Sequence, residues 1–260
     1  MTTLLFYKET TALNREQSKT LRFTPSTDFS FASDVNSVPL TGIEFFEASR
    51  DLPVLFSRDE SGNYSPLALL SLVNNGHLLN DEGGTWGDVY IPAFIRRYPF
   101  ALSEDTTVCF DSKAPHFQKD EGESLFTDEG DNTETLNNIV NFLNNYDSQQ
   151  KVTQAYCAEC AECAEHDLFK PFNIQVMLEN NKPLRLDGLF TIDEQKLIEL
   201  ADNKVGEWFK KGWLAWSYAH MHSLGALRRL VKRQQTEEVE NNSNKNDSNK
   251  SDNVATDANA

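Results

Sequence analysis

The chain has 260 residues, of which 39% are hydrophobic and 25% charged, and its formal net charge is -16 at pH 7. This length and apolar content suffice for one large domain with a buried core, or for two small ones. No apolar run reaches the roughly 20 residues of a transmembrane helix. The acidic balance disfavours nucleic-acid binding, because contacts to phosphates need a basic surface.

The first quarter of the chain predicts little regular structure before one helix and one hairpin. We expect a flexible N-terminal arm at residues 1–20, an extended segment at Leu21–Phe31, and then a helix that Ser37 caps and Pro53 ends. A β-hairpin is predicted for residues 53–73, where two apolar runs flank the turn-rich ESGN. The predicted helix has its apolar face at Leu40, Ile43 and Phe46.

The middle of the chain alternates a short helix, a strand and a loop. Pro92 can open a helix over AFIRRY, which must end before Pro99 because the residue preceding a proline avoids the α conformation. Residues 100–110 return to strand character, and residues 111–133 form an acidic loop. From Thr133 to Cys163 the apolar positions recur at helical spacing, which predicts one long helix or two in succession.

The last third of the chain predicts a hairpin, two helices and a tail. The hairpin turns around Asn180 and Asn181; Asp193 caps a helix that runs through Leu200, and a final helix extends from about Asn203 to Lys232. Residues 234–260 are polar and should be disordered. We therefore predict an α+β fold in a single domain at 21–233. Its antiparallel strands and hairpins lie mainly in the first half and pack against the C-terminal helices.

Five sequence blocks carry a family resemblance. They are VNSVPL at 35–40, WGDVYIPAFIRRYPFAL at 86–102, DEGESLFTDEG at 120–130, LDGLFTID at 186–193 and YAHMHSLGALRRL at 218–230. In this order they resemble the bacterial SapC family, from about Leu13 to Arg233. That family is named after a surface-array (S-layer) protein locus. It differs from the SapC permease, which would need several membrane spans, and from saposin C, which would need six cysteines. The resemblance implies a relation to bacterial surface structures and no defined catalytic activity.

The aromatic and arginine cluster at 86–98 is the first candidate site. Arg96 and Arg97 stand among aromatic residues, where a guanidinium can stack on a ring or hold a carboxylate with two hydrogen bonds. One interpretation is a pocket for an anion or carboxylate, built with Trp86, Tyr90 and Tyr98. The other, which we favour from the sequence, is an internal salt bridge between the arginines and the acidic loop at 120–130.

A cysteine-rich segment is the second candidate. Cys157, Cys160, Cys163 and His166 form C-x2-C-x2-C-x2-H, and thiolates with an imidazole are zinc or iron-sulfur ligands. On a helix, however, residues three apart step by about 60°, so the outer ligands diverge by about 180° and cannot meet at one ion. Buried core cysteines are the favoured interpretation, and we predict no metal site.

Two histidines are the third candidate. His220 and His222 lie two positions apart on a predicted helix, so their side chains point in nearly opposite directions and do not suit a shared metal. The family resemblance covers Tyr218, Ala219 and His220 in this motif, and His222 departs from it. We keep His220 in the candidate binding set, although a structural histidine is the favoured interpretation.

Two charged segments have opposite sign. Residues 101–167 hold fifteen acidic and three basic side chains, whereas residues 204–233 hold seven basic and one acidic. They either face one another or leave the basic segment free for an anionic partner, and we favour the first. The acidic loop could bind calcium, although its spacing does not fit an EF-hand. Its carboxylates are Asp120, Glu121, Glu123, Asp128, Glu129 and Asp131.

The final helix also has an aromatic and basic composition that suits a membrane surface. Its members are Trp208, Phe209, Trp213 and Trp216, with Lys204, Lys210, Lys211, Arg228 and Arg229. A stripe along the same helix suits packing on a sheet instead, and it runs through Val205, Phe209, Trp216, Ser223, Leu224, Leu227 and Leu230. We favour a core helix.

No serine elbow, phosphate loop or dinucleotide fingerprint appears in the sequence. The leading hypothesis is therefore a non-enzymatic binding or accessory protein, whose partner is an unknown protein or a small anionic ligand. A surface-layer component that needs export and calcium, or an undiscovered metal-dependent enzyme, are the alternatives. The apolar run in MTTLLFYKET is too short for a secretory signal, so we expect a cytoplasmic location, with signal-independent export to the cell surface as the alternative.

Overall fold

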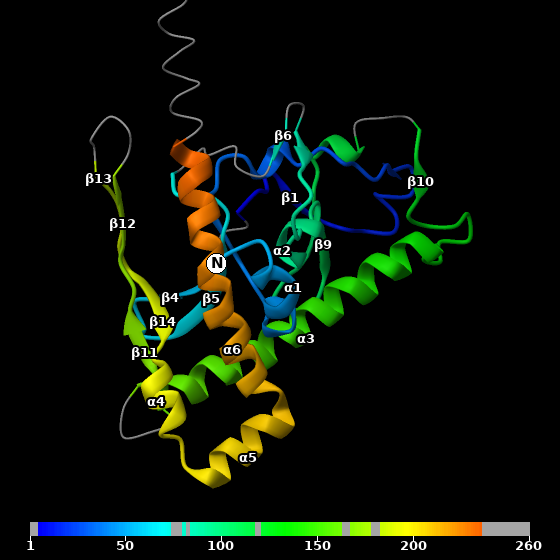
Figure 1. Cartoon of the computed structure of the whole chain (residues 1–260). Coiled ribbons are helices and arrows are strands. Elements are labelled where there is room, and N and C mark those ends of the chain that lie inside the picture. Colours follow the sequence, from blue (N-terminus) through cyan, green and yellow to red (C-terminus); the bar gives the residue numbers. More distant parts are fainter. Residues whose placement is uncertain are drawn as a thin grey trace, which may run out of the picture.

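A five-stranded antiparallel sheet is the centre of the fold (Figure 1). The computed structural model describes residues 5–73, 80–81, 84–117, 121–162, 167–177 and 183–235. In spatial order the strands are β11 (Phe169–Pro171), β14 (Leu189–Ile192), β4 (Val54–Arg58), β5 (Tyr64–Leu69) and β3 (Ser37–Pro39). The strands β4 and β5 pair from Val54 with Ala68 to Arg58 with Tyr64, which confirms the predicted hairpin at 53–73.

The sheet is covered on both faces, which explains the unbroken apolar run in β4. Val54 and Phe56 belong to the main hydrophobic cluster, while Leu55 belongs to a second cluster with Leu230. Successive side chains of a strand point to opposite faces, so both faces of β4 must be apolar. All three β4 residues are fully buried.

A smaller sheet includes the N-terminal segment. Its order is β1 (Thr10–Ala12), β9 (Val108–Asp111) and β8 (Phe100–Leu102). The sequence predicts a loose arm at 1–20, but β1 pairs with β9 and Phe6 is buried in the main cluster. The strand character predicted for residues 100–110 is confirmed, and the segment forms a hairpin of β8 and β9. Local periodicity misses β1 because its partner is about a hundred residues away.

Short pairs of strands and 3-10 turns complete the periphery. The pairs are β2 (Arg22–Phe23) with β10 (Glu123–Ser124), β6 (Asn80–Asp81) with β7 (Thr85–Trp86), and β12 (Ile174–Met177) with β13 (Pro183–Leu186). The turns are η1 (Ser30–Ala32) and η3 (Pro115–Phe117). The pairing of β12 with β13 confirms the late hairpin, whose predicted turn at Asn180 and Asn181 lies outside the described residues.

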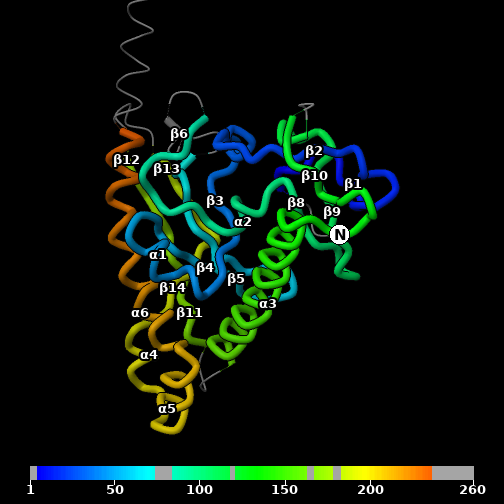
Figure 2. The backbone as a smooth tube through the Cα atoms, turned by 90° about the vertical axis from the view of Figure 1, so that its right-hand side faces the viewer, coloured from blue at the N-terminus to red at the C-terminus, as the bar shows by residue number. Residues whose placement is uncertain are grey.

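One long helix, α3 (Glu134–Glu162), connects the two sheets. Near its start Leu136 and Leu143 pack into the cluster around β8 and β9, whereas Tyr156 and Cys157 near its end pack into the main core. Figure 2 shows α3 running diagonally from the β8–β9 sheet down to the main sheet. The helical pattern predicted from Thr133 is therefore confirmed as a single helix within the described residues.

The C-terminal third of the chain is mostly helical, and its helix α6 packs on the main sheet against β4 and β14. The helices are α4 (Glu194–Ile198), α5 (Asp202–Lys211), α6 (Trp213–Ser223) and the 3-10 turn η4 (Leu224–Ala226), with helix again at 227–235. The predicted cap is confirmed, because the Asp193 side chain accepts a hydrogen bond from the backbone N–H of Gln195. The prediction of one final helix from about Asn203 to Lys232 is wrong, because Gly212, with a φ of +76°, separates α5 from α6.

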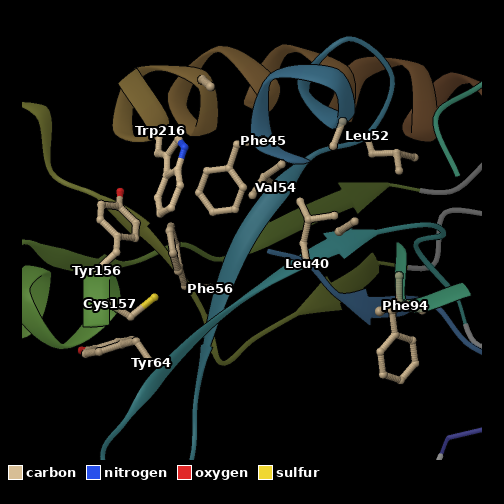
Figure 3. Packing of buried hydrophobic residues seen from close by; sticks show 14 of the residues in the cluster. Leu40, Phe45, Leu52, Val54, Phe56, Tyr64, Phe94, Tyr156, Cys157 and Trp216 are labelled. Atoms are coloured by element: carbon tan, nitrogen blue, oxygen red, sulfur yellow. The ribbon is translucent and has the colours of Figure 1, made fainter. Parts of the chain in front are cut away.

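The helix predicted from Ser37 begins later than the sequence indicates. Ser37–Pro39 is β3, and the helical segment consists of η2 (Gly42–Glu44) and α1 (Phe45–Ser49). The predicted apolar face is also wrong, since Ile43 and Phe46 are 51% and 54% exposed and Phe45 is buried instead. In Figure 3 Phe45 lies beside Trp216 of α6, with their ring centroids 6.1 Å apart.

These elements give the α+β fold predicted from the sequence. The strands lie mostly in the first half, and the helices that cover them lie toward the C-terminus. The predicted disordered tail at 234–260 lies outside the described residues from position 236 onward.

Candidate functional site

A short helix carries the two neighbouring arginines. The helix α2 (Ala93–Arg96) begins after Pro92 and ends at Arg97, just before the cis peptide bond between Tyr98 and Pro99. Proline suits the start of a helix because its fixed φ is already helical and its missing N–H would have no partner there. The helix predicted over AFIRRY is confirmed. Because the N–H groups in the first turn of a helix have no intrahelical acceptor, the backbone N–H of Ala93 is free to bind a side chain from elsewhere.

That side chain is the buried carboxylate of Glu44. Its Oε1 accepts hydrogen bonds from the Ala93 N–H at 2.7 Å and the Tyr90 hydroxyl at 2.9 Å. Its Oε2 accepts from the N–H of Thr41 at 2.9 Å and from the Thr41 hydroxyl at 2.7 Å. Glu44 is 4% exposed, and these bonds satisfy both of its oxygens. The carboxylate therefore joins η2 to the start of α2.

Arg96 lies at the surface beside this network. Its Nε donates to the carbonyl oxygen of Ile91 at 3.0 Å, and one terminal nitrogen donates to the Tyr90 hydroxyl at 3.4 Å. The guanidinium carbon lies 5.5 Å from the ring centroid of Phe142 and 5.9 Å from that of Tyr90. Among the described residues, no carboxylate lies within ion-pair distance of Arg96. It is a stacked cation without an acidic partner in this part of the chain.

A cleft of about 210 Å³ opens at Arg96, and we call it the Arg96 cleft. Its walls come from η2 and α1, from α2 with the preceding residues, and from one face of α3. The lining residues are Thr41, Ile43, Glu44, Glu47, Tyr90, Ala93, Arg96, Phe142, Asn145, Tyr146 and Gln149. The α3 residues recur at intervals of three and four, so they form one stripe of the helix.

Titration of the cleft phenol is suppressed. Burial, followed by the charge of Glu44 and its hydrogen bond, raises the pKa of Tyr90 far above its ordinary value. The hydroxyl therefore stays protonated, donates to Glu44 and accepts from Arg96. Tyr146 behaves similarly, because burial raises its pKa. At neutral pH the fixed charges lining the cleft are the guanidinium and the carboxylates of Glu44 and Glu47.

Arg97 and Tyr98 lie behind the cleft and not in it. The Arg97 guanidinium carbon lies 4.1 Å from the ring centroid of Phe94 and 5.2 Å from that of Tyr146, and its Nε is buried without a hydrogen-bond partner in the described chain. The Tyr98 hydroxyl donates to Asp111 at 3.0 Å. The salt bridges predicted from Arg96 and Arg97 to the acidic loop do not form with its described residues, 121–130.

Asp111 anchors the N-terminal strand. It is fully buried and accepts hydrogen bonds from the backbone N–H groups of Lys8, Glu9 and Lys113, in addition to Tyr98. Burial alone would raise the pKa of Asp111, but these hydrogen bonds hold it below the ordinary value. The sequence gives no sign of this role, since two of the four donors, Lys8 and Glu9, come from the predicted flexible arm.

Trp86 and His220 are both remote from the cleft walls. Trp86 packs edge-on against Phe29, with 5.4 Å between ring centroids. His220 lies on the buried face of α6 and is completely buried, and its Nδ1 donates to the carbonyl oxygen of Val54 at 2.8 Å. Its Nε2 accepts from the N–H of Ile192 at 3.2 Å and lies 2.8 Å from the Thr191 hydroxyl. Of the six candidate binding residues, the structure brings only Tyr90 and Arg96 together in the Arg96 cleft.

The His220 ring is held in one neutral form. The Ile192 N–H requires an unprotonated Nε2, so the proton lies on Nδ1. Burial lowers the pKa of His220 to about 4, against a smaller opposing effect of the Val54 carbonyl. The neighbouring Ser223 hydroxyl accepts from the Val54 N–H at 2.8 Å. His220 thus fastens α6 to two central strands, β4 and β14.

The cysteines pack in the core. Cys157 and Cys160 are buried cysteines that form no disulfide bond, and burial raises the pKa of the Cys157 thiol to about 12. Figure 3 shows Cys157 on α3 between Tyr156 and Tyr64. The other two members of the motif, Cys163 and His166, lie outside the described residues. Among residues that the structure does describe, no three His, Cys, Asp or Glu side chains are grouped to hold a metal ion.

The basic C-terminal segment meets the acidic segment at Lys204. Of the basic C-terminal side chains, Lys204 pairs with Glu159 of the acidic segment at 2.8 Å, whereas the Asp128 backbone carbonyl in the acidic loop accepts from Lys19.

The tryptophans Trp208, Trp213 and Trp216 are buried, which favours a core helix over a membrane-surface helix, although Phe209 is 76% exposed. None of the described helices is long and apolar enough to cross a bilayer.

A comparison of the sequence with known protein families identifies the family of this chain. The SapC family model matches residues 13–230, which is most of the chain. The chain belongs to the SapC family. All lining residues of the Arg96 cleft, and His220 as well, lie inside the matched region. A comparison with curated proteins and one with solved structures find no match to this SapC protein.

Sequence reasoning missed Glu44, which organises the cleft. A signal was present, because Thr41-x-x-Glu44 has the spacing of a capping box, in which a threonine and a glutamate bond reciprocally at a helix start. The pattern was masked by the earlier cap proposed at Ser37. The helical periodicity from Thr133 to Cys163 predicts the helix that carries Phe142 and Tyr146, but nothing local indicates that this part of α3 would face α2.

Proposed function

We propose that this SapC-family protein is a non-enzymatic binding protein, and that the Arg96 cleft is its site for an anionic ligand. The observation that carries the proposal is the Arg96 guanidinium, which lies over the rings of Phe142 and Tyr90 beside a cleft and has no acidic partner in the described chain. A guanidinium has five N–H donors, and the described protein partners of Arg96 occupy two of them. Three remain available to a ligand.

The surroundings of Arg96 favour recognition over support. An arginine that stabilises a fold is usually paired with a carboxylate, as desolvating an unpaired charge is unfavourable. Arg96 instead stays exposed at the rim, while the nearest buried carboxylate, Glu44, is already satisfied by four donors. The Ile91 and Tyr90 bonds fix the direction of the side chain, so little conformational freedom is lost when a ligand binds.

The chemistry of the lining supports a binding role. The phenols of Tyr90 and Tyr146 have raised pKa values and stay protonated, and each oxygen of the Glu44 carboxylate already accepts two hydrogen bonds from the protein. Besides Arg96, the exposed carboxylate of Glu47 and the hydroxyl of Thr41, amide, aliphatic and aromatic groups make up the rest of the lining. Such residues orient a bound molecule and exclude water, and they do not activate a nucleophile.

Substitution of Arg96 tests the proposal. Three anion probes of different shape would be titrated into the full chain and followed by backbone amide NMR: inorganic phosphate, para-fluorobenzoate and naphthalenesulfonate. We expect at least one probe to shift the amides of α2 and of residues 142–149, and Arg96→Gln to weaken that probe at least tenfold. The matched control is Arg228→Gln, an exposed arginine away from the cleft. Equal effects of all three probes on wild type and Arg96→Gln would refute the proposal.

A cytoplasmic location belongs to the same proposal. It rests on the short apolar run of MTTLLFYKET, and a cytoplasmic location would keep the buried thiols of Cys157 and Cys160 reduced. Fractionation of cells that express the natural protein tests it, with the cytosolic fraction as the expected location. Recovery from the cell-surface fraction would instead support the alternative of a surface-layer component exported without a signal peptide.

A further inference from the structure

We infer that the Arg96 cleft takes a monocarboxylate that carries one aromatic ring or a branched aliphatic group of similar size. This inference rests on the proposed binding function and names the chemical class of the ligand. It follows from the charge balance of the lining, from the shape of the available donors, and from the size and composition of the walls.

The charge balance selects a singly charged anion. The cleft is lined by one guanidinium, from Arg96, and by the carboxylates of Glu44 and Glu47. Glu47 is exposed and forms an ion pair with Arg50 at 3.2 Å. A phosphate near neutral pH carries up to two negative charges and would face two carboxylates with a single cation. A monoanion is attracted by Arg96 and meets less repulsion from the acidic wall.

The available donors suit a planar carboxylate. Nε of Arg96 is used by Ile91 and one N–H of a terminal nitrogen by Tyr90, so the free donors belong to the two terminal nitrogens. These nitrogens lie in the plane of the guanidinium and match the two oxygens of a carboxylate. The guanidinium carbon of Arg96 lies 5.5 Å from the ring centroid of Phe142, so this ring helps to hold the arginine side chain in place and Phe142 is a positioning residue.

The walls accommodate one apolar group. Ile43, Ala93, Phe142 and Tyr146 contribute the apolar lining, and Ile43 is 51% exposed at the rim. The volume of about 210 Å³ is smaller than the roughly 300–1,000 Å³ of sites for drug-sized ligands. A single ring or branched side chain with its carboxylate is therefore the appropriate size, and an extended polycyclic molecule is not.

Two side chains on α3 are placed to form hydrogen bonds with a second polar group of the ligand. Asn145 and Gln149 lie four residues apart on the lining stripe, and their amides can donate and accept hydrogen bonds. A free acid would not need them. The carboxyl end of a polypeptide with an apolar last residue offers a carboxylate and an apolar group as the free acid does, and it adds a backbone amide. A free acid and a polypeptide carboxyl end therefore both have the required chemistry.

Calorimetric titration of the full chain with a set of matched probes tests the inference. The probes are phenylacetate, the uncharged phenylacetamide, acetate, inorganic phosphate, and an acetylated tetrapeptide that ends in phenylalanine. We expect phenylacetate to bind at least tenfold more tightly than phenylacetamide, acetate or phosphate. Arg96→Gln should remove this preference, while Arg228→Gln should leave it unchanged.

Two further variants test the parts of the argument separately. Glu47→Gln removes one exposed negative charge, so phosphate affinity should rise several-fold and by a larger factor than phenylacetate affinity. Phe142→Leu removes the stacked ring, and phenylacetate affinity should fall about tenfold. Thermal unfolding of each variant shows whether the fold is retained, and Gln149→Ala reports on the amide contact of the peptide.

The outcomes separate the inference from the proposed function. Arg96-dependent binding of phosphate that is tighter than that of phenylacetate, or equal binding of phenylacetamide, would overturn the inference and leave anion binding at Arg96 intact. Absence of any Arg96-dependent binding would overturn both. Tighter binding of the tetrapeptide than of phenylacetate, lost in Gln149→Ala, would support a polypeptide carboxyl end as the source. Equal or weaker binding of the tetrapeptide would support a free acid.

Discussion

His220 and Arg96 are both polar residues in aromatic surroundings, yet the fold uses them in opposite ways. His220 is completely buried, and protein groups bind both of its ring nitrogens. Arg96 is exposed, and the structure gives it two hydrogen bonds out of five possible donors. A satisfied buried group contributes to stability, whereas an oriented group with free donors can contribute to recognition. Burial and unused hydrogen-bonding capacity therefore distinguish the two roles better than residue type.

Replacement of His220 should have the largest effect on stability. His220→Ala leaves the Ile192 N–H and the Val54 carbonyl without their partner and opens a cavity beneath α6, so we expect a loss of about 3–5 kcal/mol in the free energy of unfolding. Urea unfolding at neutral pH measures it. His222→Ala is the control, since His222 is exposed on the same helix and should change stability by less than about 0.5 kcal/mol. Similar losses in the two variants would contradict the assigned role.

The pH dependence of stability should report the same histidine. The pKa of His220 is lowered to about 4 in the folded protein, whereas an unfolded histidine has a pKa of about 6.5. The unfolded chain therefore binds the proton more tightly, and the contribution is complete above about pH 6.5 and is lost as the pH falls toward 4. The expected difference is about 3 kcal/mol.

The measurement for this prediction is the unfolding free energy of wild type minus that of His220→Gln, taken from pH 7 to pH 4. His116, whose pKa is lowered by burial, adds to the slope of both proteins and is removed by the subtraction. The difference should decrease in magnitude as the pH falls. A difference that does not vary with pH would show that His220 is not buried in its neutral form.

A glycine at the start of the cleft wall tests how rigidly that wall is held. A Cβ on Gly42 would lie within 2.7 Å of three ring atoms of Trp216, and overpacking of this kind costs about 1–3 kcal/mol. We expect Gly42→Ala to destabilise the protein by that amount in thermal unfolding. Gly206→Ala is the matched control, because its Cβ would meet no atom within 4 Å in α5, so it should stabilise by about 0.5–1 kcal/mol. A neutral Gly42→Ala would mean that η2 shifts easily.

The smallest expected effects on the free energy of unfolding are those of the two neighbouring arginines, Arg96 and Arg97. Arg97→Gln removes a guanidinium enclosed by Phe94 and Tyr146 and should cost about 0.5–1 kcal/mol. Arg96→Gln should change stability by less than about 0.5 kcal/mol, since the side chain is exposed. Denaturant unfolding of the two variants side by side measures this. A larger loss for Arg96→Gln than for Arg97→Gln would assign Arg96 a structural role.

Elements with strong local signals were predictable from the sequence. The long helix α3, the β4–β5 hairpin, the Asp193 cap and the start of α2 after Pro92 are confirmed, because periodicity, turn residues and capping act over a few positions. Errors fall where a distant partner decides. Ser37–Pro39 became a strand because it pairs with Leu67–Leu69, and β1 exists because β9 accepts it. The predicted apolar face of α1 was wrong because Trp216 of α6 determines which side is covered.

The candidate site was predictable in composition and not in arrangement. The density of aromatic residues around Arg96 and Arg97 indicated an anion pocket or an internal salt bridge, and the sequence favoured the salt bridge. Within the described residues neither arginine has an acidic partner, and Phe142 and Tyr146 of α3 receive them instead. This outcome depends on how α3 crosses α2, which no local pattern encodes.

The sequence alone determined the SapC family, the α+β class and the residue types available for recognition, because these follow from local patterns and ordered motifs along one chain. Tertiary structure decided which polar groups are satisfied. His220 found three partners on strands far away in the sequence, Glu44 found four donors from two segments, and Arg96 kept donors that no described residue uses. Long-range packing controls desolvation, and desolvation determines whether a polar side chain serves stability or remains available to a ligand.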